Sequence, residues 1–338
     1  MNTAERTEHA KVVNARICAM GGAAIWSGIA LLAHFGRVPV GAIELLFLFA
    51  PLVIVPLGME LGSIVITQRL PHPTRDSWST RVDSLAGIAQ PFGAAMAVLA
   101  LLSPPAMPAA LFALGWMTVC LLLAAAGIFG LISYSSLKDV GGNRALLVEI
   151  ALAMARIDLV VGGAWFVASR FGMRPMGIQE PIGLLTAVHF HFAGFGTATI
   201  AGAMLQFAES RSHGRLLRWI VPLVAGMPFV VALGFVISPV LKMMAAVIFS
   251  ACVAALAILL PILASHVESK AARVFLHVAA VSVFAGMALS VIYAIADLRG
   301  IDVLPIPQMA RTHGLLNAVG FCLCGLLGWL IELTPPAE

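Results

Sequence analysis

The sequence contains few charged residues. Lys, Arg, Asp and Glu make up 11% of its 338 residues, whereas 61% of the residues are hydrophobic. Because soluble domains have roughly a quarter charged and less than half apolar residues, this composition excludes an ordinary soluble domain and predicts a polytopic membrane protein. The formal net charge is only +4. Since the basic residues are scattered over many short loops, the charge pattern also argues against binding of nucleic acid.

Cysteine is also scarce, and its placement predicts no disulfide and no metal site. The five cysteines all lie in apolar segments, where a free thiol behaves as a small hydrophobic group. The spacing of Cys322 and Cys324 puts two thiols on different faces of a helix, and no second cysteine pair accompanies them. We therefore assign these cysteines to core packing.

The apolar residues fall into segments long enough to cross a bilayer as helices. Windows of about 19 residues predict ten spans, at about 17–36, 40–66, 84–102, 107–134, 144–168, 181–207, 217–238, 242–266, 273–297 and 311–332. Prolines that cannot continue a helix divide the third span from the fourth, at Ser103-Pro104-Pro105, and the seventh from the eighth, at Pro239. The predicted fold is an all-α polytopic bundle, a single integral membrane domain over residues 1–338.

The distribution of basic residues predicts the orientation of the bundle. The N-terminal tail and the loops after spans two, four, six and eight hold 13 of the 20 Lys and Arg residues, and the opposite side holds six. Because cytoplasmic loops carry an excess of Lys and Arg, both termini are predicted to be cytoplasmic.

The span at 181–207 carries two histidines, His189 and His191, in a stretch without Asp, Glu, Lys or Arg. Ionisable groups at this depth are costly in lipid and are candidates for a functional site. Residues two positions apart on a helix point about 200° apart. We therefore expect one imidazole to face a site and the other to face a second site or a neighbouring helix.

Three more spans contribute candidate residues. The span at 144–168 carries Glu149, Arg156 and Asp158; a buried Arg156 needs a carboxylate partner, which Glu149, Asp158 or Glu60 from the second span would supply. Glu60 is open to two interpretations, a partner for an arginine or an acid/base. The remaining candidates, four positions apart at the start of the tenth span and therefore on one helical face, are His313 and Asn317.

Two segments, VHFHFAGFGTATIAG and RTHGLLNAVGFCLCGLLGW, resemble the YndJ-like family of bacterial multi-span membrane proteins over roughly the second half of the chain. The resemblance implies a protein of the bacterial inner membrane whose two histidine motifs belong together, and it implies no particular chemistry. The His-Phe-His string is also similar to the haem-ligating segment of haem-copper oxidases and, more distantly, to NnrS proteins. This sequence lacks the paired-histidine copper segment of the oxidases.

These residues support three hypotheses. The first is a cofactor-independent membrane enzyme of the cyclase, isomerase or hydratase type, acting on a lipophilic small molecule. In it, His189, His191 or His313 is the acid/base, Asp158 or Glu60 orients it or serves as a second acid/base, and Arg156 or Asn317 stabilises negative charge. The second is a redox or sensor protein that binds haem or a transition metal through His189, His191 and His313. The third is a proton-coupled transporter with a relay of Arg156, Asp158 and Glu60.

Overall fold

The computed structural model describes residues 3–68, 77–135, 138–208 and 213–334, which form ten helical rods and, within these ranges, no strand. Seven rods are continuous α-helices, and the other three are α-helices interrupted by π-helical turns. The first half contains α1 (Thr3–His34), α2 (Ala42–Phe49) with η1 (Ala50–Ile54) and α3 (Val55–Thr67), α4 (Ser77–Leu102), α5 (Met107–Ser135) and α6 (Lys138–Phe171).

The second half repeats this mixture of continuous and interrupted helices. After a short 3-10 turn, η3 (Pro175–Gly177), it contains α7 (Ile182–His189) with η4 (Phe190–Gly196) and α8 (Thr197–Phe207), α9 (Gly214–Ile237), α10 (Pro239–Ala264), α11 (Lys270–Leu298) and α12 (Ile306–Met309) with η5 (Ala310–Gly314), η6 (Leu316–Leu323) and α13 (Cys324–Leu333).

The helices confirm the predicted all-α bundle and the two proline breaks. Helix α4 ends at Leu102 and α5 begins at Met107, while α9 ends at Ile237 and α10 begins at Pro239. Within the described ranges, nine rods are long and apolar enough to cross a membrane. The tenth, α6, has 34 residues and carries the charged side chains predicted for it. Its charges are tolerated because α5, α7, η4, α8 and α9 pack around it.

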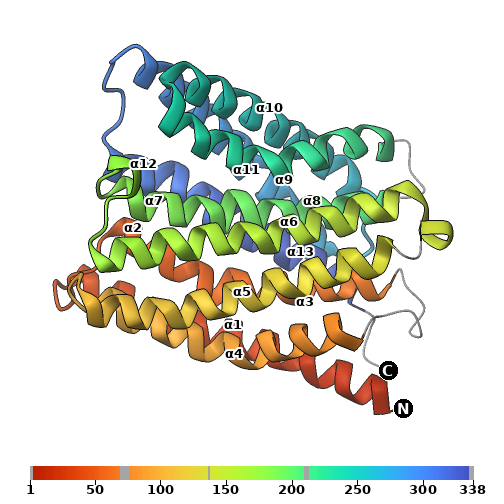
Figure 1. Ribbon diagram of the computed structural model, residues 1–338. Coiled ribbons are helices and arrows are strands. Elements are labelled where there is room, and N and C mark those ends of the chain that lie inside the picture. Colours follow the sequence, from red (N-terminus) through yellow and green to blue (C-terminus); the bar gives the residue numbers. More distant parts are fainter. Residues whose placement is uncertain (1–2, 69–76, 136–137, 209–212, 335–338) are drawn as a thin grey trace.

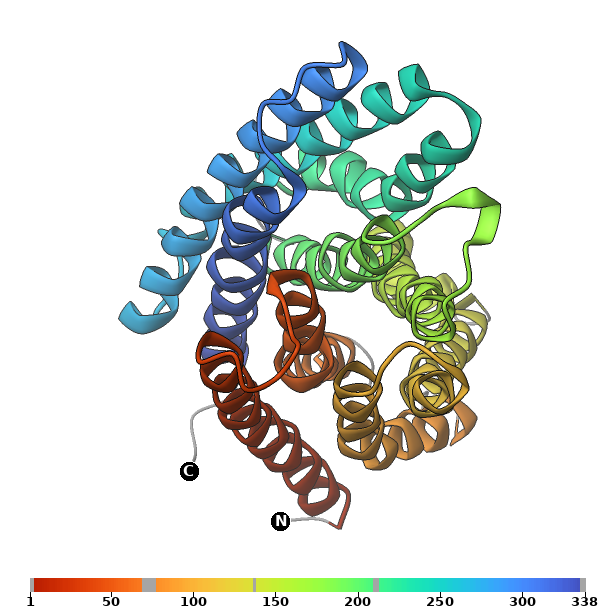
Figure 2. The same cartoon turned by 90° about the vertical axis from the view of Figure 1, so that its left-hand side faces the viewer.

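Two rods form the centre of the bundle. In the end view of Figure 2, α2–α3 and α7–α8 lie in the middle, with the other helices around them. The spans Ala42–Thr67 and Ile182–Phe207 are each 78% buried over their most apolar window, whereas the other seven range from 17% to 44%. The histidine motif of residues 189–191 therefore lies on one of the two most enclosed helices.

Helix α1 begins and α13 ends at the same end of the bundle (Figure 1), as an even number of crossings requires. Which end faces the cytoplasm stays a prediction. Three arginines that entered the charge count lie outside the described residues: Arg69, Arg75 and Arg211.

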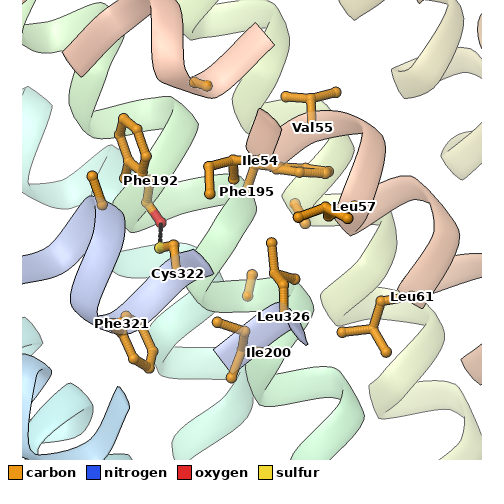
Figure 3. Packing of buried hydrophobic residues seen from close by; sticks show 14 of the residues in the cluster. Ile54, Val55, Leu57, Leu61, Phe192, Phe195, Ile200, Phe321, Cys322 and Leu326 are labelled. Atoms are coloured by element: carbon orange, nitrogen blue, oxygen red, sulfur yellow. Dashed lines mark hydrogen bonds between the residues drawn. The ribbon is translucent and has the colours of Figure 1, made fainter. Parts of the chain in front are cut away.

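The π-helical turns of the three interrupted rods contact one another: η1 packs against η4 and η6, and η4 packs against η6. Pro51 in η1 has no N–H and cannot donate to a helical ladder. In η4, the carbonyl of Phe192 accepts from the Thr197 hydroxyl at 2.9 Å and from the Cys322 thiol at 3.7 Å, the contact drawn in Figure 3. π-Turns inside helices are frequent at functional sites. The side chains around the junction of η1, η4 and η6 are therefore candidates for a functional site.

Large apolar side chains seal the junction. Phe195, Ile54 and Leu326 are almost fully buried and lie close together in Figure 3. A Cβ added at Gly58 would lie 2.5 Å from the Phe195 ring. The rods therefore approach closely where glycine allows it, as in other membrane bundles.

Candidate functional site

His189 and His313 lie next to each other although 124 positions separate them in the sequence. Their ring centroids are 6.5 Å apart, with an angle of 27° between the ring planes. His189 is the last residue of α7, and His313 lies in η5. Each is seven residues past the start of its rod, or ~10 Å along it at 1.5 Å per residue. The two histidine motifs, which the family resemblance implied to belong together, therefore meet in the structure.

Main-chain carbonyls fix the tautomer of both rings. The Nδ1 atom of His189 lies 2.8 Å from the carbonyl oxygen of Leu185, and Nδ1 of His313 lies 2.8 Å from that of Gly286. A carbonyl oxygen only accepts hydrogen bonds, so Nδ1 carries the proton in each ring. The Nε2 atom of each neutral imidazole is left with its lone pair, available to take a proton or bind a ligand.

Asn317 and Gly286 hold His313 in place. The Asn317 amide donates to the backbone carbonyl of His313 at 2.7 Å. Its approach to His313 Nδ1, at 3.3 Å, joins two donors, so we assign the amide proton to the carbonyl. A Cβ at Gly286 would lie 2.8 Å from the Asn317 amide nitrogen. Glycine at this position of α11 therefore lets both side chains reach the α11 backbone.

The histidine pair is only partly covered by the protein. His189 is exposed and His313 is half-buried, although the span that carries His189 is otherwise 78% buried over its most apolar window. His189 is therefore a polar side chain at an open position of an enclosed helix.

His191 lies apart from this pair, fully buried between α5, α6 and α2. Its Nε2 accepts from the Trp116 indole N–H at 2.9 Å, and its Nδ1 lies 2.8 Å from the carbonyl oxygen of Ala187. Phe47 packs edge-on at 5.1 Å between centroids. Both ring nitrogens of His191 are thus engaged by protein groups. The expectation that His189 and His191 face different neighbours agrees with these contacts.

Arg156 does not join the histidines. Its Nη2 lies 3.0 Å from Oδ1 of Asp83 on α4, in a largely buried ion pair. The expectation that Glu149, Asp158 or Glu60 would pair with Arg156 is therefore corrected. Asp83 lies one residue before the predicted third span, which starts at residue 84, whereas the helix begins at Ser77. The partner of Arg156 is therefore just outside the predicted span.

Glu60 has an arginine partner at the end of the bundle where the chain starts. Arg16 Nε donates to Glu60 Oε1 at 2.7 Å, and Arg16 Nη2 donates to the Thr334 hydroxyl at 2.7 Å. Of the two interpretations of Glu60, the structure agrees with the ion pair. Arg16 likewise lies one residue before the predicted first span, which starts at residue 17.

Asp158 is fully buried on α6, and neither of its carboxylate oxygens has a hydrogen-bond partner among the described residues. A Cβ at Gly194 in η4 would lie 2.6 Å from its carboxyl carbon. The candidate residues therefore separate into five places. These are the pair of His189 and His313 with Asn317, the enclosed His191, the ion pair of Arg156, the ion pair of Glu60, and Asp158 against η4.

A family model for YndJ-like proteins matches residues 45–321. The chain belongs to the YndJ-like family. The match covers most of the chain and extends the resemblance, expected for the second half only, to the second span. The YndJ-like chain is 30% identical over 190 residues to the "Uncharacterized membrane protein YndJ" of Bacillus subtilis (strain 168).

The alignment with the Bacillus subtilis protein covers 56% of this chain and 34% of that protein, so the chain spans about a third of the relative's length. No solved structure matches the chain. The comparisons therefore show a multi-pass protein of the bacterial inner membrane, and they do not indicate which activity it has.

Two further features bear on what this YndJ-like protein binds. No group of three or more His, Cys, Asp or Glu side chains gathers as a metal site in the described part of the chain. A mostly apolar groove of about 460 Å³ opens between α1 and α4, over Leu52 of η1, with the buried Gln90 among its lining residues. None of the histidines lines this groove.

Proposed function

We propose that this YndJ-like protein is an integral membrane enzyme in which His189 and His313 exchange protons with a lipophilic small molecule. One observation carries the proposal: both Nδ1–H groups are held by main-chain carbonyls, at 2.8 Å each, which leaves two Nε2 atoms on rings 6.5 Å apart. A neutral Nε2 accepts a proton and a protonated one donates it. Two such groups side by side supply the acid and the base of one reaction.

The reaction class follows from these two groups. Proton removal at one carbon or oxygen and proton delivery at another gives an isomerisation, a cyclisation or a hydration, with no net oxidation. Asn317 acts as a positioning residue because its amide binds the His313 backbone. Arg156 and Glu60 have ion-pair partners elsewhere, and the proposal does not use them.

The test compares the lipophilic extracts of cells that express the wild type or single variants. We expect a species formed with the wild type to be lost in His189→Gln and in His313→Gln. The matched control is His277→Gln, because His277 is also exposed and its Nδ1 also lies against the carbonyl four residues earlier, at 2.7 Å. Equal extracts from the wild type and both histidine variants, at equal protein levels in the membrane, would count against the proposal.

A second candidate function is binding of haem or a transition metal, and the same tautomer favours it. Histidines that bind metals usually donate the other ring N–H to a carbonyl or carboxylate and bind the metal through the free nitrogen. His189 and His313 have this arrangement, whereas Trp116 occupies Nε2 of His191. The optical spectrum and metal content of the purified protein decide between the candidates. Soret absorbance or stoichiometric metal that disappears in His189→Gln would replace the acid–base proposal.

A further inference from the structure

The carboxyl group of Asp158 is buried without a partner in the described part of the chain. It is 0% exposed, and neither of its oxygens has a hydrogen-bond partner among the described residues. Two other acids in the bundle interior, by contrast, lie against cations: Glu60 against Arg16 at 2.7 Å and Asp83 against Arg156 at 3.0 Å. Asp158 differs from these acids because no cation in the described part of the chain forms an ion pair with it.

Asp158 packs against the glycine backbone of η4. A Cβ at Gly194 would lie 2.8 Å from its Oδ2, so the carboxyl group packs directly on η4. One turn along α6, Gly162 packs in the same way on His191, where a Cβ would lie 2.6 Å from the ring Nδ1. His191 already uses both nitrogens, toward Ala187 and Trp116.

Several other titratable and polar groups on the packed elements have partners of their own, while Glu149 and Arg170 lie nine and twelve positions from Asp158 on α6. On its own helix, Arg156 pairs with Asp83. Helix α5 contributes Cys120, which lies near Gly163. The hydroxyls of Thr197 and Thr199 on α8 donate to carbonyls of their own rod, and α9 carries charges only at its start, on Arg215 and Arg218.

An ionised carboxylate in this position would be shielded from bulk water and would have no cation beside it among the described residues. A buried unpaired charge costs far more than neutralisation of the group. A bound metal cation in place of the proton would need several oxygen ligands, whereas Gly194 covers the carboxyl group. The protonated, neutral form of the Asp158 carboxyl group is therefore the form compatible with these surroundings.

We propose that Asp158 is a proton-binding site in the core of this protein, occupied in the conformation described here. Release of the proton to water leaves a carboxylate, which requires α6 and η4 to separate far enough to admit water. Proton release is thereby linked to the contact between α6 and η4. Since His189 directly precedes η4, the same separation would move one member of the histidine pair. The proposal rests on Asp158 and its surroundings, independently of the proposed function.

Infrared spectroscopy of the purified protein, with aspartate labelled by ¹³C at the side-chain carboxyl carbon, tests the proposal without a substitution. We expect a protonated carboxylic-acid band that shifts with the label and persists at neutral pH. The band should be absent in Asp158→Asn and retained in Asp83→Asn, the control for an ion-paired aspartate. The labelled wild type gives the result even if a variant fails to fold.

Two outcomes would overturn the proposal. Absence of any labelled acid band in the wild type at neutral pH would mean that Asp158 is ionised. Loss of the band on addition of Na⁺ at constant pH would mean that the site holds a metal cation instead of a proton. Neither outcome affects the histidine pair, whose test uses different residues and a different measurement.

Discussion

At the residue scale, the burial of an ion pair determines how much stability is lost when one of its members is replaced. The guanidinium of Arg156 is 8% exposed and the Asp83 carboxylate is 17% exposed. Removal of one member of such a pair leaves an uncompensated charge in the bundle, which is more costly than loss of both members.

We expect Asp83→Ala to lower the free energy of unfolding in detergent micelles by roughly 3 kcal/mol, because Arg156 is left without its anion. The double variant Asp83→Ala, Arg156→Met should recover most of this loss. The control pair, Lys242 and Asp297, is more exposed, at 25% and 37%, so Asp297→Ala should cost less than about 1 kcal/mol. A double variant no more stable than Asp83→Ala would show that the ion pair is not what matters at this position.

The contact between Trp116 and His191 gives a second prediction at this scale. Trp116→Phe keeps an aromatic ring but removes the indole N–H that donates to His191 at 2.9 Å. A buried acceptor without its donor costs roughly 1–3 kcal/mol. We expect a loss of this size in denaturant unfolding, with the extract profile of the wild type retained. A profile altered as in His189→Gln would instead place His191 in the reacting site.

The sequence alone identified the residues of the histidine pair but not their surroundings. Charge-free windows and four-residue spacing were enough to single out His189, His313 and Asn317. Gly286, Trp116, Asp83 and Arg16 were missed for physical reasons: a main-chain carbonyl has no sequence signal, an indole in an apolar span is indistinguishable from packing, and the two charges lay just beyond the predicted span ends.

At the scale of elements, hydropathy and proline placed the helices well, because length and breaks are local properties of the chain. The π-turns could not be placed, since a ladder of i to i−5 hydrogen bonds depends on the packing of three rods. Helix α6 was predicted although its charges exceed what a lone span carries; its neighbours on several sides make it possible.

Close approach of α1 to η1 gives a prediction at this scale. A Cβ at Gly22 would lie 1.9 Å from the carbonyl oxygen of Leu52, whereas one at Gly21 meets nothing within 4 Å. Because backbone cannot yield as a side chain does, Gly22→Ala should cost roughly 1–3 kcal/mol in unfolding free energy. Gly21→Ala should be neutral or stabilising by up to about 1 kcal/mol, since alanine favours helix over glycine. Similar stabilities of the two variants would contradict the close packing of α1 on η1.

At the scale of the whole molecule, the two ends of the bundle differ in their predicted number of basic residues. The end where α1 begins and α13 ends (Figure 1) also holds the ion pair of Arg16 with Glu60 and the contact of Arg16 with Thr334, which tie α1, α3 and the end of α13 together. The loops predicted for this side carry 13 of the 20 basic residues. Basic loops stay on the cytoplasmic side during insertion, so this end should face the cytoplasm.

Reporter fusions measure this orientation. We expect green fluorescent protein fused after residue 338 to fluoresce and alkaline phosphatase at the same position to be inactive, because the first matures in the cytoplasm and the second outside it. Fused within residues 299–305, between α11 and α12, the reporters should give the opposite result. The reverse pattern at both positions would show that the bundle has the opposite orientation in the membrane. The histidine pair lies ~10 Å along its rods from the end opposite the termini, so the pattern also decides the side of the membrane from which a ligand reaches it.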